Sequence, residues 1–175
     1  MLVAMVTVRA GREDKVAMDL MDALYPYDQE VKVSKTDFSG LLILRTSLNP
    51  KRLLDILRNK PIAHLYKVLP FNYYSSLDES SLGGELVRLL SRINLEWRKF
   101  LIKVKVRGNK EIDENALSLK LAKLVEEKLG KRGDLKKPEL VIRVEVIGND
   151  VGISIYRGNT FVNISGYRKR SIEKV

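Results

Sequence analysis

The stretch that decides the fold runs from Phe100 to Tyr156 and reads FLIKVKVRGNKEIDENALSLKLAKLVEEKLGKRGDLKKPELVIRVEVIGNDVGISIY. Its first residues alternate between apolar side chains (Ile102, Val104, Val106) and cations (Lys103, Lys105, Arg107). Successive side chains of a β-strand point to opposite faces of the sheet. This period of two therefore predicts a strand with an apolar core face and a basic outer face.

The pattern changes after this strand. An amphipathic helix is expected to begin near Asp113-Glu114, where acidic residues suit the positive end of the helix dipole. A loop rich in cations and turn residues follows, with the sequence KRGDLKKPE at residues 131–139. We call it the cationic loop. Two further strands of alternating polarity complete the stretch, so the order is strand, helix, loop, strand, strand.

This order resembles the THUMP domain, an RNA-binding module of tRNA-modification enzymes. The specific part of the resemblance is a basic strand that ends in Arg107-Gly108, followed one helix later by Asp-Leu-Lys-x-Pro-Glu at residues 134–139 and by the strand VIRVEV at residues 141–146. The resemblance implies an α/β THUMP domain over residues 77–175 whose function is to bind tRNA.

The pattern of the N-terminal residues predicts a separate domain. Its expected elements are strands at residues 2–8, 31–33, 41–44 and 63–69 and helices at residues 13–24 and after Asn49-Pro50. The order β-α-β-β-α-β is the ferredoxin-like pattern, and many THUMP proteins carry such a subdomain in front. We therefore expect a ferredoxin-like subdomain at residues 1–72, a linker at residues 70–76, and a helix at residues 78–93 that opens the second domain.

The charge of the chain favours a polyanionic partner. Lys and Arg number 32 against 22 Asp and Glu, which gives a net charge of +10 and an isoelectric point near 9.7. The excess is uneven, because residues 1–76 hold 11 basic and 8 acidic residues and the rest hold 21 and 14. Solubility or heat tolerance is the alternative explanation of such a charge.

Several classes of site are excluded or disfavoured. The chain has no cysteine, so disulfides, thiolate catalysis and Cys-ligated zinc are excluded. His64 is the single histidine, in an expected strand, and we interpret it as structural. No dinucleotide or Walker motif surrounds Gly83-Gly84, for which helix entry or close packing is the better explanation. With no signal peptide and no apolar run long enough to span a bilayer, we expect a soluble, cytoplasmic protein without membrane contact.

Three segments are candidates for RNA binding, because phosphate is best bound where cations converge on one surface. They are the basic strand face, the cationic loop and the C-terminal segment: Lys103, Lys105, Arg107; Lys131, Arg132, Lys136, Lys137; and Arg157, Arg168, Lys169, Arg170. The first two have an ordinary alternative, since a basic face can pair with acids of a neighbouring strand such as Glu145 and a cationic loop can simply be solvated.

Two aromatic residues have different expected roles. Trp97, the only tryptophan, is expected to pack in the core of the second domain or between domains. Tyr156 has the opposite parity to Val151, Ile153 and Ile155, so we expect it to face away from the core at a strand edge, where base stacking is an option.

The resemblance also implies a role for the whole chain. Enzymes with a THUMP domain attach it to a catalytic module, and neither a methyltransferase motif nor a pyrophosphatase loop is present here. The arrangement resembles the stand-alone adaptor family that helps an acetyltransferase make N4-acetylcytidine in tRNA. We therefore expect a non-catalytic tRNA-binding adaptor without metal or cofactor, partnered by a separate enzyme such as an RNA cytidine acetyltransferase. The alternatives are a fragment or accessory subunit of an enzyme for thiolation, methylation or pseudouridylation, and a protein-interaction module with an acidic partner.

Overall fold

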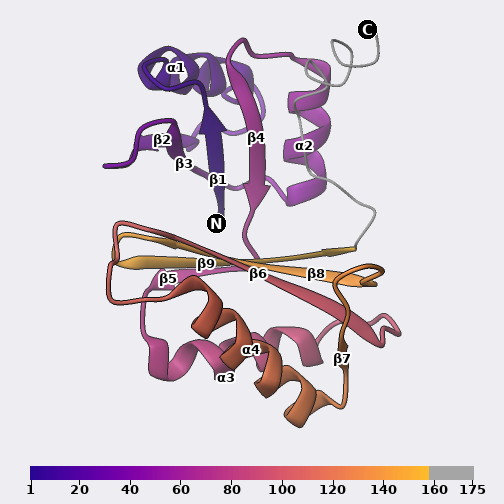
Figure 1. Ribbon diagram of the computed structural model, residues 1–175. Helices are drawn as coiled ribbons and strands as arrows, with labels where there is room; N and C mark the ends of the chain where they lie inside the picture. Colours follow the sequence, from indigo (N-terminus) through magenta and orange to yellow (C-terminus); the bar gives the residue numbers. More distant parts are fainter. Residues whose placement is uncertain (158–175) are drawn as a thin grey trace, which may run out of the picture. The chain divides into compact units, whose positions relative to one another are not determined.

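The computed structural model describes residues 1–157. Within that range the chain folds into two compact units, residues 1–71 and residues 72–157. We call them the N-terminal unit and the C-terminal unit. Each has its own sheet and its own hydrophobic core (Figure 1).

The N-terminal unit has the predicted order of elements. They are β1 (Leu2–Val8), α1 (Glu13–Leu24), β2 (Lys32–Lys35), β3 (Leu41–Thr46), α2 (Pro50–Asn59) and β4 (Leu65–Pro70). The sheet has the strand order β2-β3-β1-β4, and every neighbouring pair is antiparallel. This topology confirms the ferredoxin-like fold that the sequence predicts.

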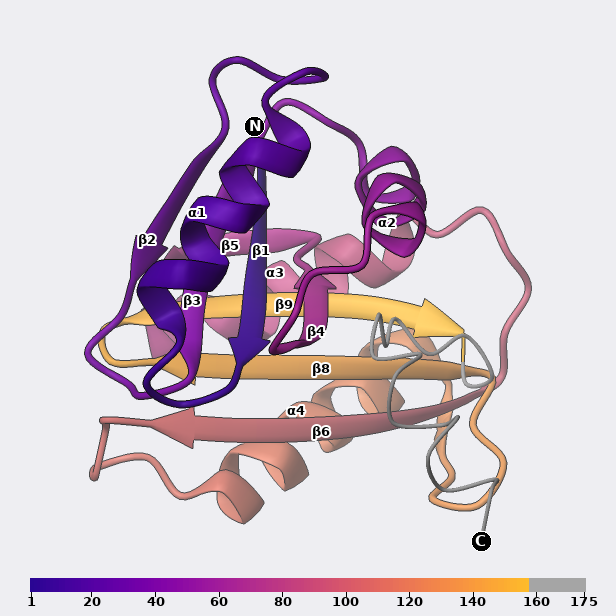
Figure 2. The same ribbon diagram turned by 90° about the horizontal axis from the view of Figure 1, so that it is seen from above.

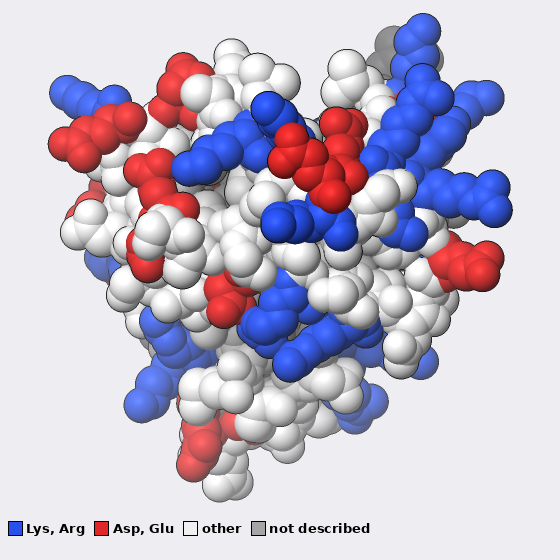
Figure 3. All heavy atoms as spheres, turned by 90° about the horizontal axis from the view of Figure 1, so that it is seen from below, with Lys and Arg blue, Asp and Glu red and all other residues white. Residues whose placement is uncertain are grey.

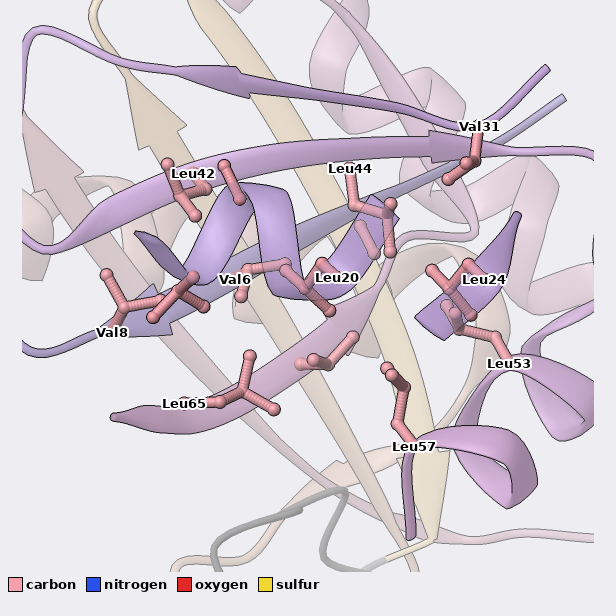
Figure 4. Close-up of a cluster of buried hydrophobic side chains, with 14 of the residues drawn as sticks. Val6, Val8, Leu20, Leu24, Val31, Leu42, Leu44, Leu53, Leu57 and Leu65 are labelled. Atoms are coloured by element: carbon pink, nitrogen blue, oxygen red, sulfur yellow. The ribbon is translucent and has the colours of Figure 1, made fainter. Parts of the chain in front are cut away.

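Local sequence explains how these elements form. Asn49 caps α2, since its side-chain oxygen accepts a hydrogen bond from the Arg52 backbone N–H at 2.9 Å, and Pro50 follows at the first helical position. Alternate residues of β1, such as Val6 and Val8, point to the helices and meet Leu20 of α1 in one core (Figure 4). The other helix contributes Leu53 and Leu57 to this core (Figure 4).

The C-terminal unit contains a five-stranded sheet and two helices. Its elements are β5 (Tyr73–Ser76), α3 (Glu79–Ser91), β6 (Lys99–Arg107), α4 (Glu114–Leu129), β7 (Arg132–Gly133), β8 (Leu140–Ile147) and β9 (Asp150–Arg157). The strand order is β5-β9-β8-β6-β7, with β6 parallel to β8 and β7 and with β9 antiparallel to β5 and β8. Figure 2 shows β6, β8 and β9 side by side, and Figure 1 shows α3 and α4 on one face of this sheet.

The core of this unit lies between the sheet and the two helices. Ile102 and its partner Ile142 belong to it, which confirms the predicted core face of the basic strand. A Cβ atom on Gly83 would lie 2.6 Å from Leu124 Cδ2, so this glycine lets α3 approach α4 closely. Close packing is thus the role of Gly83.

Three expectations about secondary structure are wrong. Residues 73–76 form the edge strand β5 where the sequence suggested a linker, because their backbone pairs with β9. The two-residue strand β7 lies within the cationic loop. His64 lies in a turn before β4 with φ of +67°, and its carbonyl accepts a hydrogen bond from the Arg9 backbone N–H at 2.9 Å.

Candidate nucleic-acid interface

The cationic loop is fixed to the start of β6 through β7. The Arg132 backbone N–H donates to the Arg98 carbonyl at 2.9 Å, and the Asp134 N–H donates to the Phe100 carbonyl at 2.8 Å. Asp134 then turns the chain, since one of its carboxylate oxygens accepts from the backbone N–H groups of Lys136 and Lys137, both at 2.9 Å. An aspartate that binds amides two and three residues ahead is a typical device for a tight turn.

The two acidic side chains of the loop accept hydrogen bonds from backbone amides, Asp134 from amides of the loop and Glu139 from amides at the start of β6. The amide of Lys137 first, then the ammonium of Lys99 at 3.0 Å and the amide of Lys136, lower the pKa of Asp134 to about 2. Glu139 accepts hydrogen bonds from the backbone N–H groups of Arg98 and Lys99, and both lower its pKa. These carboxylates stay ionised near neutral pH and shape the loop, but neither forms an ion pair with the side chain of another loop residue.

The cations of the loop consequently divide into two groups. Arg132, Lys136 and Lys137 are exposed, and their side chains have no hydrogen-bond or ion-pair partner among residues 1–157. Lys131 is different, because its Nζ donates to the Trp97 carbonyl at 2.7 Å and lies 4.7 Å from the centre of the indole ring. The structure thus gives Lys131 a structural contact and leaves three loop cations to solvent.

A hollow of about 500 Å³ lies beside the loop. Its wall includes Lys136, Lys137 and Arg157, together with the acidic residues Glu96 and Glu139. Arg157 reaches it because the end of β9 pairs with the start of β8, with Arg157 opposite Leu140. Figure 3 shows Lys and Arg gathered on the right-hand side of the molecular face seen from below, the side on which β7 lies in Figure 1.

Apart from the loop, further cations lie on β6 and β8, on the sheet face opposite α3 and α4. In the parallel pairing of β6 and β8, Lys103 lies opposite Arg143 and Lys105 lies opposite Glu145, so all four share this face with Arg107. We call these five residues the cationic sheet face. Lys103 is exposed and has no side-chain partner among residues 1–157. Lys105, also exposed, forms an ion pair with Glu114 at 3.1 Å.

Two arginines of this face share one carboxylate. Arg107 Nη1 lies 2.5 Å from Glu145 Oε2, and Arg143 Nε donates to Glu145 Oε1. The side chain of Glu145 is fully buried, whereas those of Arg107 and Arg143 are 25% and 24% exposed. Pairing with an acid of the neighbouring strand, the alternative explanation of the basic face, therefore applies to Arg107.

The predicted residues form two sites. The loop cations and Arg157 gather at the start of β6 and β8, whereas Arg107 lies at the other end of β6, about 23 Å along the strand from Phe100. Lys103 and Lys105 lie between these ends. Arg168, Lys169 and Arg170, the remaining predicted cations, lie outside the described residues.

That Arg143 joins Arg107 in binding Glu145 was not predicted from the sequence. The signal was present in the strand VIRVEV, where both residues have the parity of the outer face and lie in register with the basic strand. Their mutual pairing depends on side-chain geometry that alternation alone does not specify.

The aromatic residues follow the expectations in part. Trp97 is 5% exposed and packs edge-on against Phe100, with 6.2 Å between the ring centres, so its core role is confirmed. Tyr156 is half-buried and lies opposite Val141, with β8 on one side of its strand. The strand β9 lies between β5 and β8 in the sheet, but β5 pairs with it only from Asp150 to Ile153, so within residues 1–157 the segment that carries Tyr156 pairs with β8 alone.

Two other kinds of site are absent from residues 1–157. That part of the chain contains no group of three or more His, Asp or Glu side chains placed to hold a metal ion. None of its helices combines the length and hydropathy that a membrane crossing requires.

The geometry of the C-terminal unit agrees with a sequence comparison. Residues 88–156 match the THUMP domain family. This chain contains a THUMP domain. The match covers α4, β6, β8 and all but the last residue of β9, and it includes both the cationic loop and the cationic sheet face. THUMP domains occur in tRNA-binding proteins of tRNA modification. No curated protein sequence matches the chain.

Solved structures share the fold at low sequence identity. TrmN from Thermus thermophilus matches with a TM-score of 0.68 and 16% identity, over 100% of this chain and 50% of that protein. PH1313 from Pyrococcus horikoshii Ot3 matches with a TM-score of 0.69 and 16% identity, over 89% of this chain and 54% of that one. A 4-thiouridine synthetase, crystallised with RNA and ATP, matches with a TM-score of 0.63 and 15% identity, over 90% and 41% of the two chains. The chain therefore spans about half the length of these proteins or less.

Proposed function

We propose that this protein is a non-catalytic tRNA-binding adaptor that presents tRNA to a separate modifying enzyme. The observation that carries the proposal is the state of the cationic loop inside the THUMP domain. Its acids, Asp134 and Glu139, accept hydrogen bonds from backbone amides of the loop and of β6, and Arg132, Lys136 and Lys137 remain without side-chain partners among residues 1–157. Ammonium and guanidinium groups in this state bind phosphate oxygens without first breaking an internal ion pair.

The hollow beside the loop extends this surface. Arg157 joins Lys136 and Lys137 on its wall, so cations from the loop and from β9 face one concave region. Recognition by phosphate contacts depends on backbone shape more than on base sequence. An adaptor that serves several tRNA species needs this kind of recognition.

Cytidine N4-acetylation is the modification that we propose for the partner enzyme. The support is the arrangement of a ferredoxin-like unit followed by a THUMP domain, which resembles the stand-alone adaptors of that reaction. In this arrangement the partner, an RNA cytidine acetyltransferase, brings ATP and acetyl-CoA while the present chain holds the tRNA.

One observation favours a second candidate, an RNA-binding portion of a modifying enzyme. The chain spans 50% of TrmN and 41% of the 4-thiouridine synthetase to which it is similar. The two candidates differ in whether catalysis requires another chain. Incubation of the purified protein with tRNA and with acetyl-CoA plus ATP, or with S-adenosylmethionine, separates them, because turnover without a partner would contradict the adaptor role.

Charge reversal tests the binding surface. The double variant Arg132→Glu/Lys136→Glu should bind a tRNA transcript about tenfold or more weakly, since each lost phosphate contact removes both attraction and counterion release. Fluorescence anisotropy at fixed salt measures the affinity. The melting temperature should change little, because neither side chain has a partner among residues 1–157.

A matched control carries the same change of charge elsewhere in the C-terminal unit. Lys110 and Lys120 are exposed and have no side-chain partner within residues 1–157. The variant Lys110→Glu/Lys120→Glu should retain most of the affinity. Equal losses in the two double variants would show that net charge alone, and no defined loop surface, attracts the RNA.

A further inference from the structure

The cationic sheet face contains one carboxylate that binds two arginines. Glu145 uses Oε2 for Arg107 and Oε1 for Arg143, so each guanidinium is tied to its own oxygen. The carboxylate is fully buried, and about a quarter of each arginine side chain is exposed. The three groups thus form a cluster with the acid beneath and the cations towards solvent.

The need to neutralise the buried carboxylate of Glu145 does not explain why two arginines bind it. Four cations on this face, Lys103, Lys105, Arg107 and Arg143, surround Glu145 and its outlying neighbour Glu114, which pairs with Lys105. Cations therefore exceed carboxylates by two. A buried carboxylate requires a cationic or hydrogen-bonding partner, but a second arginine on the same carboxylate adds positive charge that no acid of the cluster balances.

The arrangement also leaves donors that Glu145 does not occupy. A guanidinium has five N–H groups in a rigid fork. Arg107 and Arg143 each direct one nitrogen to Glu145, so the carboxylate does not engage the remaining N–H groups of either fork. Because the carboxylate already holds one nitrogen of each guanidinium, the arginines lose less side-chain freedom when they bind an anion than free arginines would.

We propose that Glu145 is a positioning residue, which holds Arg107 and Arg143 as a paired phosphate-binding element for the RNA backbone. This inference rests on the proposed tRNA-binding function and adds a second contact surface to the cationic loop. The exposed Lys103 lies beside Arg143 in the strand register and extends the element along β6. A phosphodiester supplies the anionic oxygens that two such forks bind.

The substitution Glu145→Gln separates positioning from neutralisation by the sign of its effect. It removes a negative charge, so general attraction alone predicts tighter RNA binding. Loss of the carboxylate that fixes both guanidinium groups predicts weaker binding, in spite of the added positive charge. We expect the affinity of the full chain for a tRNA transcript to fall about fivefold.

Glu127→Gln is the matched control for charge. Glu127 lies on α4, is 59% exposed and contacts only Lys123 at 3.8 Å among residues 1–157. Its removal changes the net charge by the same amount, and binding should stay constant or tighten slightly. Tighter binding by Glu145→Gln, to the same extent as by Glu127→Gln, would overturn the inference.

A second variant keeps the test decisive if Glu145→Gln fails to fold. Arg107→Lys/Arg143→Lys preserves the charge of the cluster but removes both forks. We expect it to bind about fivefold more weakly, with an unchanged slope of log affinity against log salt. Glu145→Gln, where it folds, should have no further effect in this background. Wild-type affinity of the double lysine variant would refute the positioning role.

The outcomes also separate this inference from the proposed function. If the wild-type chain does not bind tRNA, the proposed function itself is wrong. If the wild type binds and Arg132→Glu/Lys136→Glu binds weakly, but the variants of Glu145, Arg107 and Arg143 bind normally, the function stands and the paired element does not.

Discussion

The cationic loop and the cationic sheet face differ in how they use their acidic residues. In the loop, Asp134 and Glu139 bind backbone amides and leave the cations Arg132, Lys136 and Lys137 unpaired within residues 1–157. On the sheet face, Glu145 binds the guanidinium groups themselves and is buried beneath them. In the loop the acids bind the backbone and the cations stay unpaired within residues 1–157, whereas on the sheet face the acid binds the cations.

This difference assigns different physical contributions to the two regions. Unpaired, exposed cations act through long-range attraction and counterion release, which salt weakens. Guanidinium groups that are already oriented act through directional hydrogen bonds at short range, with a smaller entropic cost on binding. A count of basic residues does not distinguish the two regions. They are distinguished by which groups the carboxylates bind.

The largest expected contrast between the regions lies in the response to salt. Lys136→Ala/Lys137→Ala should weaken tRNA binding about tenfold and lower the slope of log affinity against log salt by about 1.5, since two phosphate contacts are lost. Arg107→Lys/Arg143→Lys should leave that slope unchanged, because the charges remain. Titrations of a tRNA transcript at several salt concentrations between about 50 and 200 mM measure both values.

An equal change in the slope of log affinity against log salt for the two variants would contradict this difference between the regions. Such a result would mean that both regions act as point charges and that the geometry around Glu145 contributes no orientation. A large change in melting temperature for either variant would instead point to damage of the fold. Thermal unfolding of each variant therefore accompanies the titrations.

Alternation predicted the C-terminal unit well because each face of β6 has a distinct environment. Ile102 and Val104 pack in the core, and Lys103 and Lys105 are exposed on the other face, as the period of two requires. The strand β5 was not predicted because Tyr73–Ser76 is short and pairs with β9, more than 70 residues away in sequence. Turn-like composition next to Pro70 outweighed a pairing that local sequence does not reveal.

The roles of individual charges were harder to predict than the elements that carry them. Lys131 belongs to a run of loop cations that look equivalent in sequence, yet its ammonium group lies over Trp97, which precedes it by 34 residues. Glu145 was expected only as one possible partner of the basic strand face, and its side chain is fully buried and binds two arginines. Both facts depend on tertiary packing, whereas composition and spacing report only which charges share a face or a loop.

A smaller effect is expected for Lys131, which contacts Trp97 and so differs from the unpaired cations of the loop. Lys131→Met should cost about 1 kcal/mol of stability, through loss of the hydrogen bond to the Trp97 carbonyl and of the cation–π contact. The affinity for tRNA should fall by less than that of Arg132→Met, which removes a cation without a partner among residues 1–157. Chemical denaturation and anisotropy titration measure the two effects. A larger loss of affinity from Lys131→Met would mean that Lys131 leaves Trp97 to contact RNA.

The smallest expected effect concerns the pH dependence of the loop. Hydrogen bonds from the backbone of Lys137 and Lys136, and the ammonium of Lys99, lower the pKa of Asp134 from 3.8 to about 2. Between these values the unfolded chain binds the proton more tightly than the folded chain, so the ionised carboxylate stabilises the fold above about pH 4. That contribution disappears as the pH falls to about 2.

The melting temperatures of the wild type and of Asp134→Asn isolate this contribution. The wild type should be slightly more stable at pH 5, and the difference should vanish as the pH approaches about 2. Asp37→Asn is the matched control, because Asp37 is exposed and accepts no side-chain hydrogen bond within residues 1–157. If the difference in melting temperature between the wild type and Asp134→Asn persisted at low pH, the protonated side chain of Asp134 would also stabilise the turn. The shape of the loop would then depend on hydrogen bonds and not on the charge of the carboxylate.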